Sequence, residues 1–241
     1  TFIDDASGKI TAAGFFLTET SEGYLHLIQK HVLQYGILLA FYSDRHSIFT
    51  AYPREDRQPI VTQFQRECSL LGIESILALT PQAKGRVERL NQTLQGRWPK
   101  EFKLRGRDIT AANQHIKEFI NEFNEKFGVK PFNTEDAHVS LPKGLGARGV
   151  RRICTAWQTR VLSKQLTFGY KNLIIQILGG SKYKMQGKEV QIVDYGTGEL
   201  EVIYEEKLLP FKVETRGQVS TFEPYEETSK TIDHRLDEIS R

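Results

Sequence analysis

Two acidic residues of the chain occupy positions from which carboxylates can hold a metal ion. Asp44 directly follows the apolar run ILLAFYS, and Glu88 lies in the segment TPQAKGRVERLNQTLQ, near Lys84 and Arg86. Such a run predicts a buried strand, and ligands bind at the carboxyl ends of strands in α/β sheets. Two carboxylates from separate elements can bind Mg²⁺. Two simpler interpretations stay open: a strand-end turn for Asp44, and an exposed Lys–Glu helix pair for Glu88.

Residues 1–128 predict an α/β domain that would position both carboxylates, because strand-like and helical patterns alternate along them. The expected strands are Phe2–Ile3, Ile10–Leu17, Ile37–Ser43 and Ile73–Leu79. The expected helices begin near Thr20, Pro59, Gln82 and Thr110. Gly36 and Gly72 are predicted to end the first two helices, and Pro99 is expected to disturb the third.

The rest of the chain has a different pattern. Residues 129–152 contain proline and glycine clusters (VKPFN, SLPKGLGARG) and are predicted to be a linker. Residues 153–213 contain short β-branched and aromatic runs between glycines, which predict a small all-β barrel. The runs are Leu166–Tyr170, Leu173–Leu178, Val190–Val193 and Leu200–Tyr204. Residues 214–241 are polar and charged, and we expect a tail with little order.

Positive charge is concentrated in one part of the chain. No Asp or Glu occurs between Ala137 and Lys188, whereas ten Lys and Arg residues do. A local cationic field attracts polyanions, above all nucleic acid, although a solvated basic face balanced by the acidic tail is the alternative. The two cysteines have no paired spacing, and no apolar run is long enough for a membrane helix. We therefore expect a cytoplasmic, DNA-associated protein without a membrane partner.

Short segments around the two carboxylates resemble those of a known family of transposases. In chain order they are YSDRHSIF, TQF, LGIE, TPQAKGRVERLNQTLQ and FNEKF. This series resembles bacterial insertion-sequence transposases of the ISNCY type, which belong to the retroviral-integrase superfamily with its Asp-Asp-Glu triad. The resemblance runs from Phe2 to about Leu141, and a weaker one covers RVLSKQLTFGY, GKEVQIV and LLPF. It implies that Asp44 and Glu88 are the second and third members of the triad.

The resemblance implies an α/β ribonuclease-H-like core, a mixed sheet flanked by helices, followed by a small barrel for DNA binding or multimerisation. The first catalytic Asp of such a core lies in the first of three antiparallel strands, but this chain has only two strand runs before its first helix. Asp4 and Asp5 have the surroundings of a hairpin turn, with Gly8 shortly after them. We therefore expect a chain that begins partway through a longer protein and lacks the first carboxylate, with Asp4 or Asp5 as the fallback.

The implied activity is Mg²⁺-dependent cleavage at transposon ends and strand transfer into target DNA, with Mn²⁺ as a substitute metal and a homo-multimer as the active form. Asp44 and Glu88 would be the metal ligands. Gln92 stands where several relatives have a lysine, so Lys84 and Arg89 would supply that DNA contact. The predicted DNA-binding residues are Lys84, Arg86, Arg89, Asn91, Arg45, His46, Arg151, Arg152, Lys164, Lys182 and Lys184. The alternatives are a catalytically incomplete DNA-binding remnant and a nuclease on the same fold.

Overall fold

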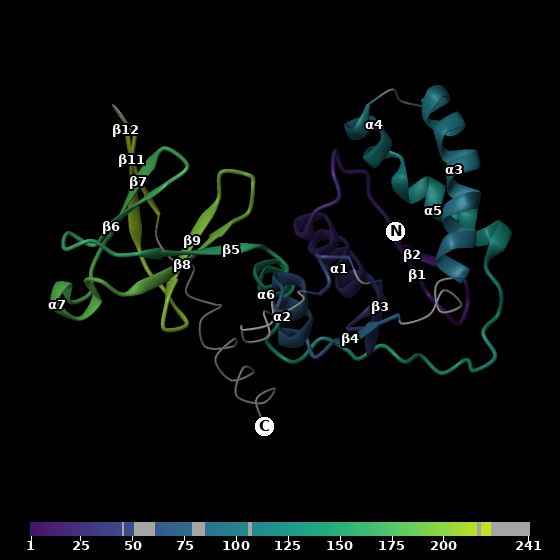
Figure 1. Ribbon diagram of the computed structural model, residues 1–241, viewed down its shortest axis with the longest axis horizontal. Coiled ribbons are helices and arrows are strands. Elements are labelled where there is room, and N and C mark those ends of the chain that lie inside the picture. The colour runs from purple at the N-terminus through teal and green to yellow at the C-terminus, as the bar shows by residue number, and fades with distance from the viewer. Residues whose placement is uncertain (45, 51–60, 79–84, 106–107, 216–217, 223–241) are drawn as a thin grey trace, which may run out of the picture. The chain divides into compact units, whose positions relative to one another are not determined.

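The structure, a computed structural model, describes residues 1–222 except 45, 51–60, 79–84, 106–107 and 216–217. The chain divides into two compact units, Thr1–Pro142 (the N-terminal unit) and Lys143–Arg241 (the C-terminal unit), which Figure 1 shows in purple to teal and in green to yellow. The predicted linker 129–152 is therefore shared between the units. Its first part folds with the N-terminal unit, because Val139 and Ile37 exchange two backbone hydrogen bonds of 2.8 Å. Its last part forms helix α6 (Ala147–Ile153).

The N-terminal unit contains two short pairs of strands. β1 (Phe2–Ile3) pairs antiparallel with β2 (Ile10–Ala12), and β3 (Ala40–Ser43) pairs parallel with β4 (Glu74–Leu77). Among the described residues, no backbone ladder joins one pair to the other. The rings of Phe2 in β1 and Phe41 in β3 nevertheless pack edge to face, with centroids 4.9 Å apart. All four strands lie within predicted runs, and three of them are shorter than predicted.

The helices of this unit begin and end largely for local reasons. They are α1 (Ser21–Tyr35), α2 (Gln63–Leu70), α3 (Gly85–Arg105), α4 (Ile109–Gln114) and α5 (Ile116–Phe127). Both predicted ends of α1 are confirmed: Thr20 accepts a 3.2 Å hydrogen bond from the Gly23 N–H, and Gly36 follows with φ +103°. The helix predicted from Thr110 is instead two helices divided at His115, and α3 continues through Pro99.

Two asparagine side chains attach α4 and α5 to the β2 segment. Asn124 accepts from the Ile10 N–H at 2.7 Å and donates to the Ile10 carbonyl at 2.9 Å. Asn113 makes the same pair of bonds with the backbone of Phe15, both at 2.9 Å. Ile10 also lies in an apolar core with residues of α3 and α5, among them Leu90. The amides therefore satisfy backbone groups that a further strand would otherwise pair.

A chain of polar contacts links α1 to the segment that follows α5. Nε2 of His31 lies 3.1 Å from Nε2 of His138, whose Nδ1 lies 2.6 Å from Asp136. If His138 donates from Nδ1 to the carboxylate, its Nε2 accepts the proton of His31 Nε2. Nδ1 of His31 is then an unprotonated nitrogen, buried without a hydrogen-bond partner in the described part of the chain. Burial, and then the charge of His138, lower the pKa of His31 to about 4 against an opposing effect of Asp4.

The C-terminal unit consists mainly of two four-stranded antiparallel sheets, in the orders β10-β9-β8-β5 and β12-β11-β7-β6. Its elements after α6 are β5 (Trp157–Val161), β6 (Thr167–Tyr170), β7 (Leu173–Ile177), α7 (Lys182–Met185), β8 (Glu189–Asp194), β9 (Leu200–Tyr204), β10 (Lys207–Leu208), β11 (Phe211–Thr215) and β12 (Gln218–Phe222). One apolar core, which includes Phe168, Ile175, Val190 and Val202, lies within this unit. No ladder closes the two sheets into a barrel among the described residues, so the barrel stays a prediction.

The predicted polar tail, residues 214–241, begins before the last strands end. β11 extends to Thr215, and β12 pairs with it from Phe211↔Phe222 to Thr215↔Gln218. A polar segment can form such a strand because the ladder satisfies its backbone hydrogen-bonding groups. Residues 223–241 of the predicted tail lie outside the described part of the chain.

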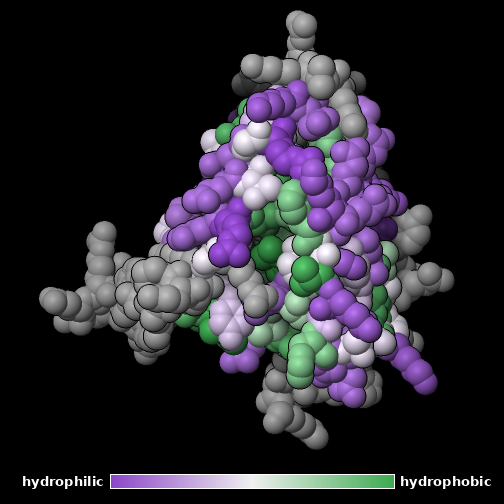
Figure 2. Space-filling view, turned by 90° about the vertical axis from the view of Figure 1, so that its right-hand side faces the viewer, coloured by the Kyte–Doolittle hydropathy of each residue, from purple (hydrophilic) through white to green (hydrophobic). Residues whose placement is uncertain are grey.

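Large apolar side chains remain exposed in the N-terminal unit. Leu39, directly before β3, is 57% exposed, and Tyr42, within β3, is 64% exposed. Phe132 is fully exposed. Figure 2 shows a face of the molecule on which an apolar area lies among hydrophilic residues. Exposed apolar surface of this kind is a feature of interaction sites and of incompletely covered sheets. Among the described residues, no helix is both long and apolar enough to span a membrane.

We predict that the N-terminal unit loses stability as the pH falls from about 6.5 to about 4. The unfolded chain protonates His31 near pH 6.5, whereas the folded protein resists protonation until about pH 4. The unfolded state therefore binds more protons in this window, and acid favours unfolding by up to about 3 kcal/mol. Chemical denaturation at about pH 7 and about pH 4.5 measures the difference. His31→Gln should remove this pH-dependent contribution to the free energy of unfolding, and the control His115→Gln should keep it. An equal change in the free energy of unfolding with pH in both variants and in the unchanged chain would contradict the prediction.

Candidate functional site

Asp44 lies at the carboxyl end of the parallel pair β3–β4. The ladder ends with Ser43↔Leu77, and the N–H of Ala78 donates to the Ser43 carbonyl at 2.7 Å. Asp44 is exposed, and its Oδ1 accepts a 3.0 Å hydrogen bond from the His46 N–H. Asp44 thus forms the strand-end turn that the sequence left open as one interpretation. Its carboxylate lies at the carboxyl end of the strand, where ligands bind in α/β folds, and its role as a metal ligand stays a prediction.

Glu88 lies in the first turn of α3, also with an exposed side chain. Leu90, two residues further on, is buried in the core that contains Ile10, which attaches this end of α3 to the β2 segment. Asp44 and Glu88 therefore belong to different elements of one unit. That they share one cation stays a prediction.

The chemistry of these two residues fits Mg²⁺. Both are exposed oxygen donors, which this hard cation prefers, and Mg²⁺ typically takes only one or two protein carboxylates. Within the described ranges, no group of three or more His, Cys, Asp and Glu side chains is placed to hold a metal ion.

Asp4 lies in the turn that joins β1 to β2. Its Oδ2 accepts from the N–H of Ser7 at 2.8 Å and from the Ser7 hydroxyl at 2.5 Å. Its own N–H donates to the Lys9 carbonyl at 2.8 Å, and Gly8 supplies the positive φ of +66°. The predicted hairpin is therefore present, and the carboxylate of Asp4 is engaged by its own turn. Asp5 is exposed in the same turn.

The predicted DNA contacts near the carboxylates are only partly described. Arg89 and Asn91 are exposed on α3, close to Glu88. Lys84 and Arg45 lie outside the described residues, as does the side chain of Arg86. His46 is exposed, and its Nδ1 accepts from the N–H of Ile48 at 3.4 Å. In a neutral ring this contact places the proton on Nε2, which gives a hydrogen-bond donor two residues from Asp44.

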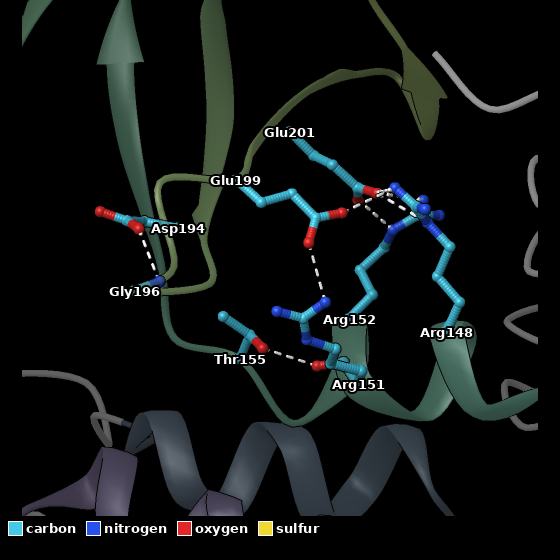
Figure 3. A network of polar contacts seen from close by, with 8 residues as sticks. All are labelled: Arg148, Arg151, Arg152, Thr155, Asp194, Gly196, Glu199 and Glu201. Atoms are coloured by element: carbon cyan, nitrogen blue, oxygen red, sulfur yellow. Dashed lines mark hydrogen bonds and ion pairs between the residues drawn. The ribbon is translucent and has the colours of Figure 1, made fainter.

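The arginines of α6 bind acidic residues of the same unit, as Figure 3 shows. Arg152 is 8% exposed and bonds Glu201 through Nε at 2.5 Å and Nη2 at 3.0 Å. Arg148 reaches Glu201 at 2.9 Å, and Arg151 reaches Glu199 at 2.8 Å. DNA binding by Arg151 and Arg152 stays a prediction: Arg152 is buried in its ion pair with Glu201, whereas the side chain of Arg151 is 34% exposed and bonded to Glu199.

Charge counting along the chain missed these partners because the acids lie just beyond the acid-free segment. The spacing of Arg148, Arg151 and Arg152 at i, i+3 and i+4 was an available signal, since it places all three on one helix face. Burial opposes the ionisation of Glu201, but hydrogen bonds and charges from Arg152 and Arg148 outweigh it and lower the pKa of its carboxyl. Of the remaining predicted residues of this unit, Lys164 and Lys184 are exposed, and the side chain of Lys182 lies outside the described part.

Aromatic side chains below the Asp44 turn were not foreseen as part of the site. The ring of Phe49, which is 4% exposed, packs against Tyr24 at 4.7 Å and Phe64 at 4.9 Å between centroids. Phe41 of β3 packs against Phe64 at 5.1 Å. We call Phe2, Tyr24, Phe41, Phe49 and Phe64 the aromatic cluster. It joins α1, α2 and both strand pairs beneath the turn that carries Asp44.

Comparison with known proteins shows similarity to transposases. The chain is 31% identical over 220 residues, which are 90% of the chain and 48% of the relative, to a protein of Sinorhizobium fredii named "Putative transposase y4bF". It is 40% identical over 132 residues, 53% of the chain and 28% of the relative, to the transposase for insertion sequence IS1202 of Streptococcus pneumoniae. The chain thus spans less than half the length of either relative. No protein-family model matches it.

Glu201→Gln should destabilise the C-terminal unit by about 3 kcal/mol or more, because it leaves the buried charge of Arg152 without a countercharge. The matched change Glu199→Gln removes a carboxylate whose side chain is 35% exposed and should cost about 1 kcal/mol or less. Urea denaturation of the two variants and the unchanged chain measures both effects. Equal losses in the two variants would contradict the assignment of Glu201 as the buried partner.

Proposed function

We propose that the intact protein is a DNA transposase of the Asp-Asp-Glu type, a polynucleotidyl transferase of the retroviral-integrase superfamily close to the ISNCY-type insertion sequences. The observation that carries this proposal is the 31% identity, over 90% of the chain, with a protein named as a transposase. The exposed carboxylates of Asp44, at the end of a parallel strand pair, and Glu88, at the start of α3, are consistent with the second and third members of the triad.

We further propose a ribonuclease-H-like core followed by a small β-barrel. The element order β1-β2-α1-β3-α2-β4 is that of such a core without the first of its three antiparallel strands. Strands on either side of a missing strand lie about 10 Å apart, a separation that two phenylalanines can bridge. The contact between Phe2 and Phe41, in two strand pairs that share no ladder in the described residues, supports this arrangement. The missing strand would carry the first catalytic Asp.

Both chemical steps would exchange one phosphorus–oxygen bond for another. Water attacks the phosphodiester at the transposon end and releases a 3′-hydroxyl; this hydroxyl then attacks a target phosphodiester in line and releases a target 3′-hydroxyl. Asp44 and Glu88 would hold Mg²⁺, or Mn²⁺ in its place, through carboxylate oxygens. The bound metal would supply Lewis-acid polarisation of the attacking oxygen and neutralise charge at the phosphate.

The other residues near the carboxylates would hold DNA. Arg86, Arg89 and Asn91 belong to the start of α3 and Lys84 precedes it in the sequence; cationic and amide side chains of these types can bind phosphates. Arg45 and His46 would contact the scissile phosphate, His46 through its Nε2–H. Exposed lysines of the C-terminal unit would add sequence-independent affinity. A homo-multimer that pairs two transposon ends is the expected active form.

In the intact protein, Asp44→Asn and Glu88→Gln should each lower strand transfer by at least about 10³-fold, because each removes a metal ligand from a site whose members act together. Binding of transposon-end DNA should change by no more than about threefold, since it depends on cationic residues. Gel assays of joined products and fluorescence anisotropy measure the two properties. Glu74→Gln, an exposed acid at the opposite end of the β3–β4 pair, is the control.

Retained joining in Asp44→Asn would contradict the enzyme proposal and favour a DNA-binding remnant. Cleavage without a joined product in the unchanged protein would favour a nuclease on the same fold.

The chain Thr1–Arg241 alone should join transposon ends to target DNA at least about 10³-fold more slowly than the intact protein, because the first carboxylate is absent. Incubation of both proteins with end DNA and Mg²⁺ or Mn²⁺ measures the difference. Strand transfer by the chain at the rate of the intact protein would show that Asp4 or Asp5 serves as the third ligand, and Asp4→Asn and Asp5→Asn would then identify which one.

A further inference from the structure

The turn that carries Asp44 is anchored at its far end by Phe49. The N–H groups of Phe49 and Thr50 both donate to the His46 carbonyl, at 2.9 and 3.2 Å, while the His46 N–H donates to Asp44. Ile48, Phe49 and Thr50 are each no more than 9% exposed, whereas Asp44 is exposed. The position of the carboxylate therefore depends on how firmly the buried half of the turn is held.

Tyr24 is the member of the aromatic cluster that connects this anchor to α1. Its ring meets Phe49 edge to face at 4.7 Å and also packs against Phe64 and Phe2, at 6.2 and 6.4 Å between centroids. Phe49 has further ring contacts with Phe64 of α2 and Phe41 of β3. Tyr24 alone in the cluster carries a polar group.

The hydroxyl of Tyr24 fixes the orientation of its ring. It donates a hydrogen bond to Oε1 of Glu19, the residue before the N-cap Thr20. Burial, the hydrogen bond to Glu19, the charge of Glu19 and then the charge of Asp44 raise the pKa of Tyr24 above its ordinary value, so the hydroxyl keeps its proton.

We propose that Tyr24 is a positioning residue for Asp44. Its ring supports Phe49 at the base of the Asp44 turn, and its hydroxyl, held by Glu19, ties that support to the start of α1. This inference rests on the proposed function, in which the placement of Asp44 controls the joining reaction. Small displacements of a metal ligand lower reaction rates strongly. Loss of the packing of Tyr24 against Phe49 should therefore lower the joining rate more than the affinity for DNA.

Tyr24→Leu, which removes the ring, should lower the joining rate of the intact protein at saturating DNA by about 10- to 100-fold. Its apparent KM for end DNA should stay within about twofold, since no DNA contact is lost. Tyr24→Phe keeps the ring and should restore the rate to within about fivefold of the unchanged protein. In the chain Thr1–Arg241, hydrogen exchange at the amides of Phe49 and Thr50 should be about tenfold faster in Tyr24→Leu and nearly unchanged in Tyr24→Phe.

Phe16→Leu is the matched control, because it removes a ring near the same end of α1 that packs against His26 rather than Phe49. It should change neither the joining rate nor the exchange at the turn. If Tyr24→Leu does not fold, Tyr24→Met, which refills the space with a flexible side chain, takes its place with the same expectations.

The outcomes separate this inference from the proposed function. If Asp44→Asn abolishes joining but the Tyr24 variants neither slow it nor speed exchange at Phe49 and Thr50, the positioning role is overturned and the function stands. If Asp44→Asn joins DNA normally, the proposed function fails, while faster exchange in Tyr24→Leu would still show that the ring holds the turn. A rate loss in Tyr24→Leu accompanied by an equal loss in Phe16→Leu would also overturn the positioning role.

Discussion

Aromatic packing holds the N-terminal unit together where backbone hydrogen bonds do not. In its described residues no ladder connects the β1–β2 pair to the β3–β4 pair, yet the contact of Phe2 with Phe41 joins them, and Phe49 and Phe64 extend the packing to the Asp44 turn and α2. Buried aromatic pairs contribute both apolar area and edge-to-face geometry. The placement of the candidate carboxylate at the strand end therefore depends on side-chain packing as much as on the β3–β4 ladder.

In this unit, side chains that are distant in the sequence form hydrogen bonds with polar groups that no backbone ladder pairs. Asn113 and Asn124 bond backbone groups of the β2 segment, and the His31–His138 contact attaches α1 to the segment after α5. Each of these contacts joins residues far apart in the chain, so each closes a long loop at an entropic cost that only cooperative packing offsets. A short pair of strands that could not persist alone is stabilised in this manner.

In the C-terminal unit, ion pairs within the fold neutralise several residues of the basic segment. The arginines of α6 neutralise Glu199 and Glu201, and Lys171 bonds Asp194 at 2.6 Å. A buried pair such as Arg152–Glu201 needs both members, because either charge alone would be poorly solvated. The unpaired cationic surface in the described part of this unit is consequently smaller than the ten basic residues of the acid-free segment would indicate.

Local signals in the sequence were sufficient for the ends of α1, the Asp4–Gly8 turn, the β3 and β4 strands and four of the eight described strands of the C-terminal unit, β6 to β9, since caps, glycines and apolar runs act over a few residues. They did not reveal β10, because the turn before it uses Glu205 and Glu206 at positive φ rather than glycine, nor β12, which depends on its ladder with β11. They also could not distinguish a DNA-binding arginine from a buried ion pair, or find Tyr24 beneath Asp44. Those properties depend on which distant residues the folded chain brings into contact, and such contacts are set by packing in three dimensions.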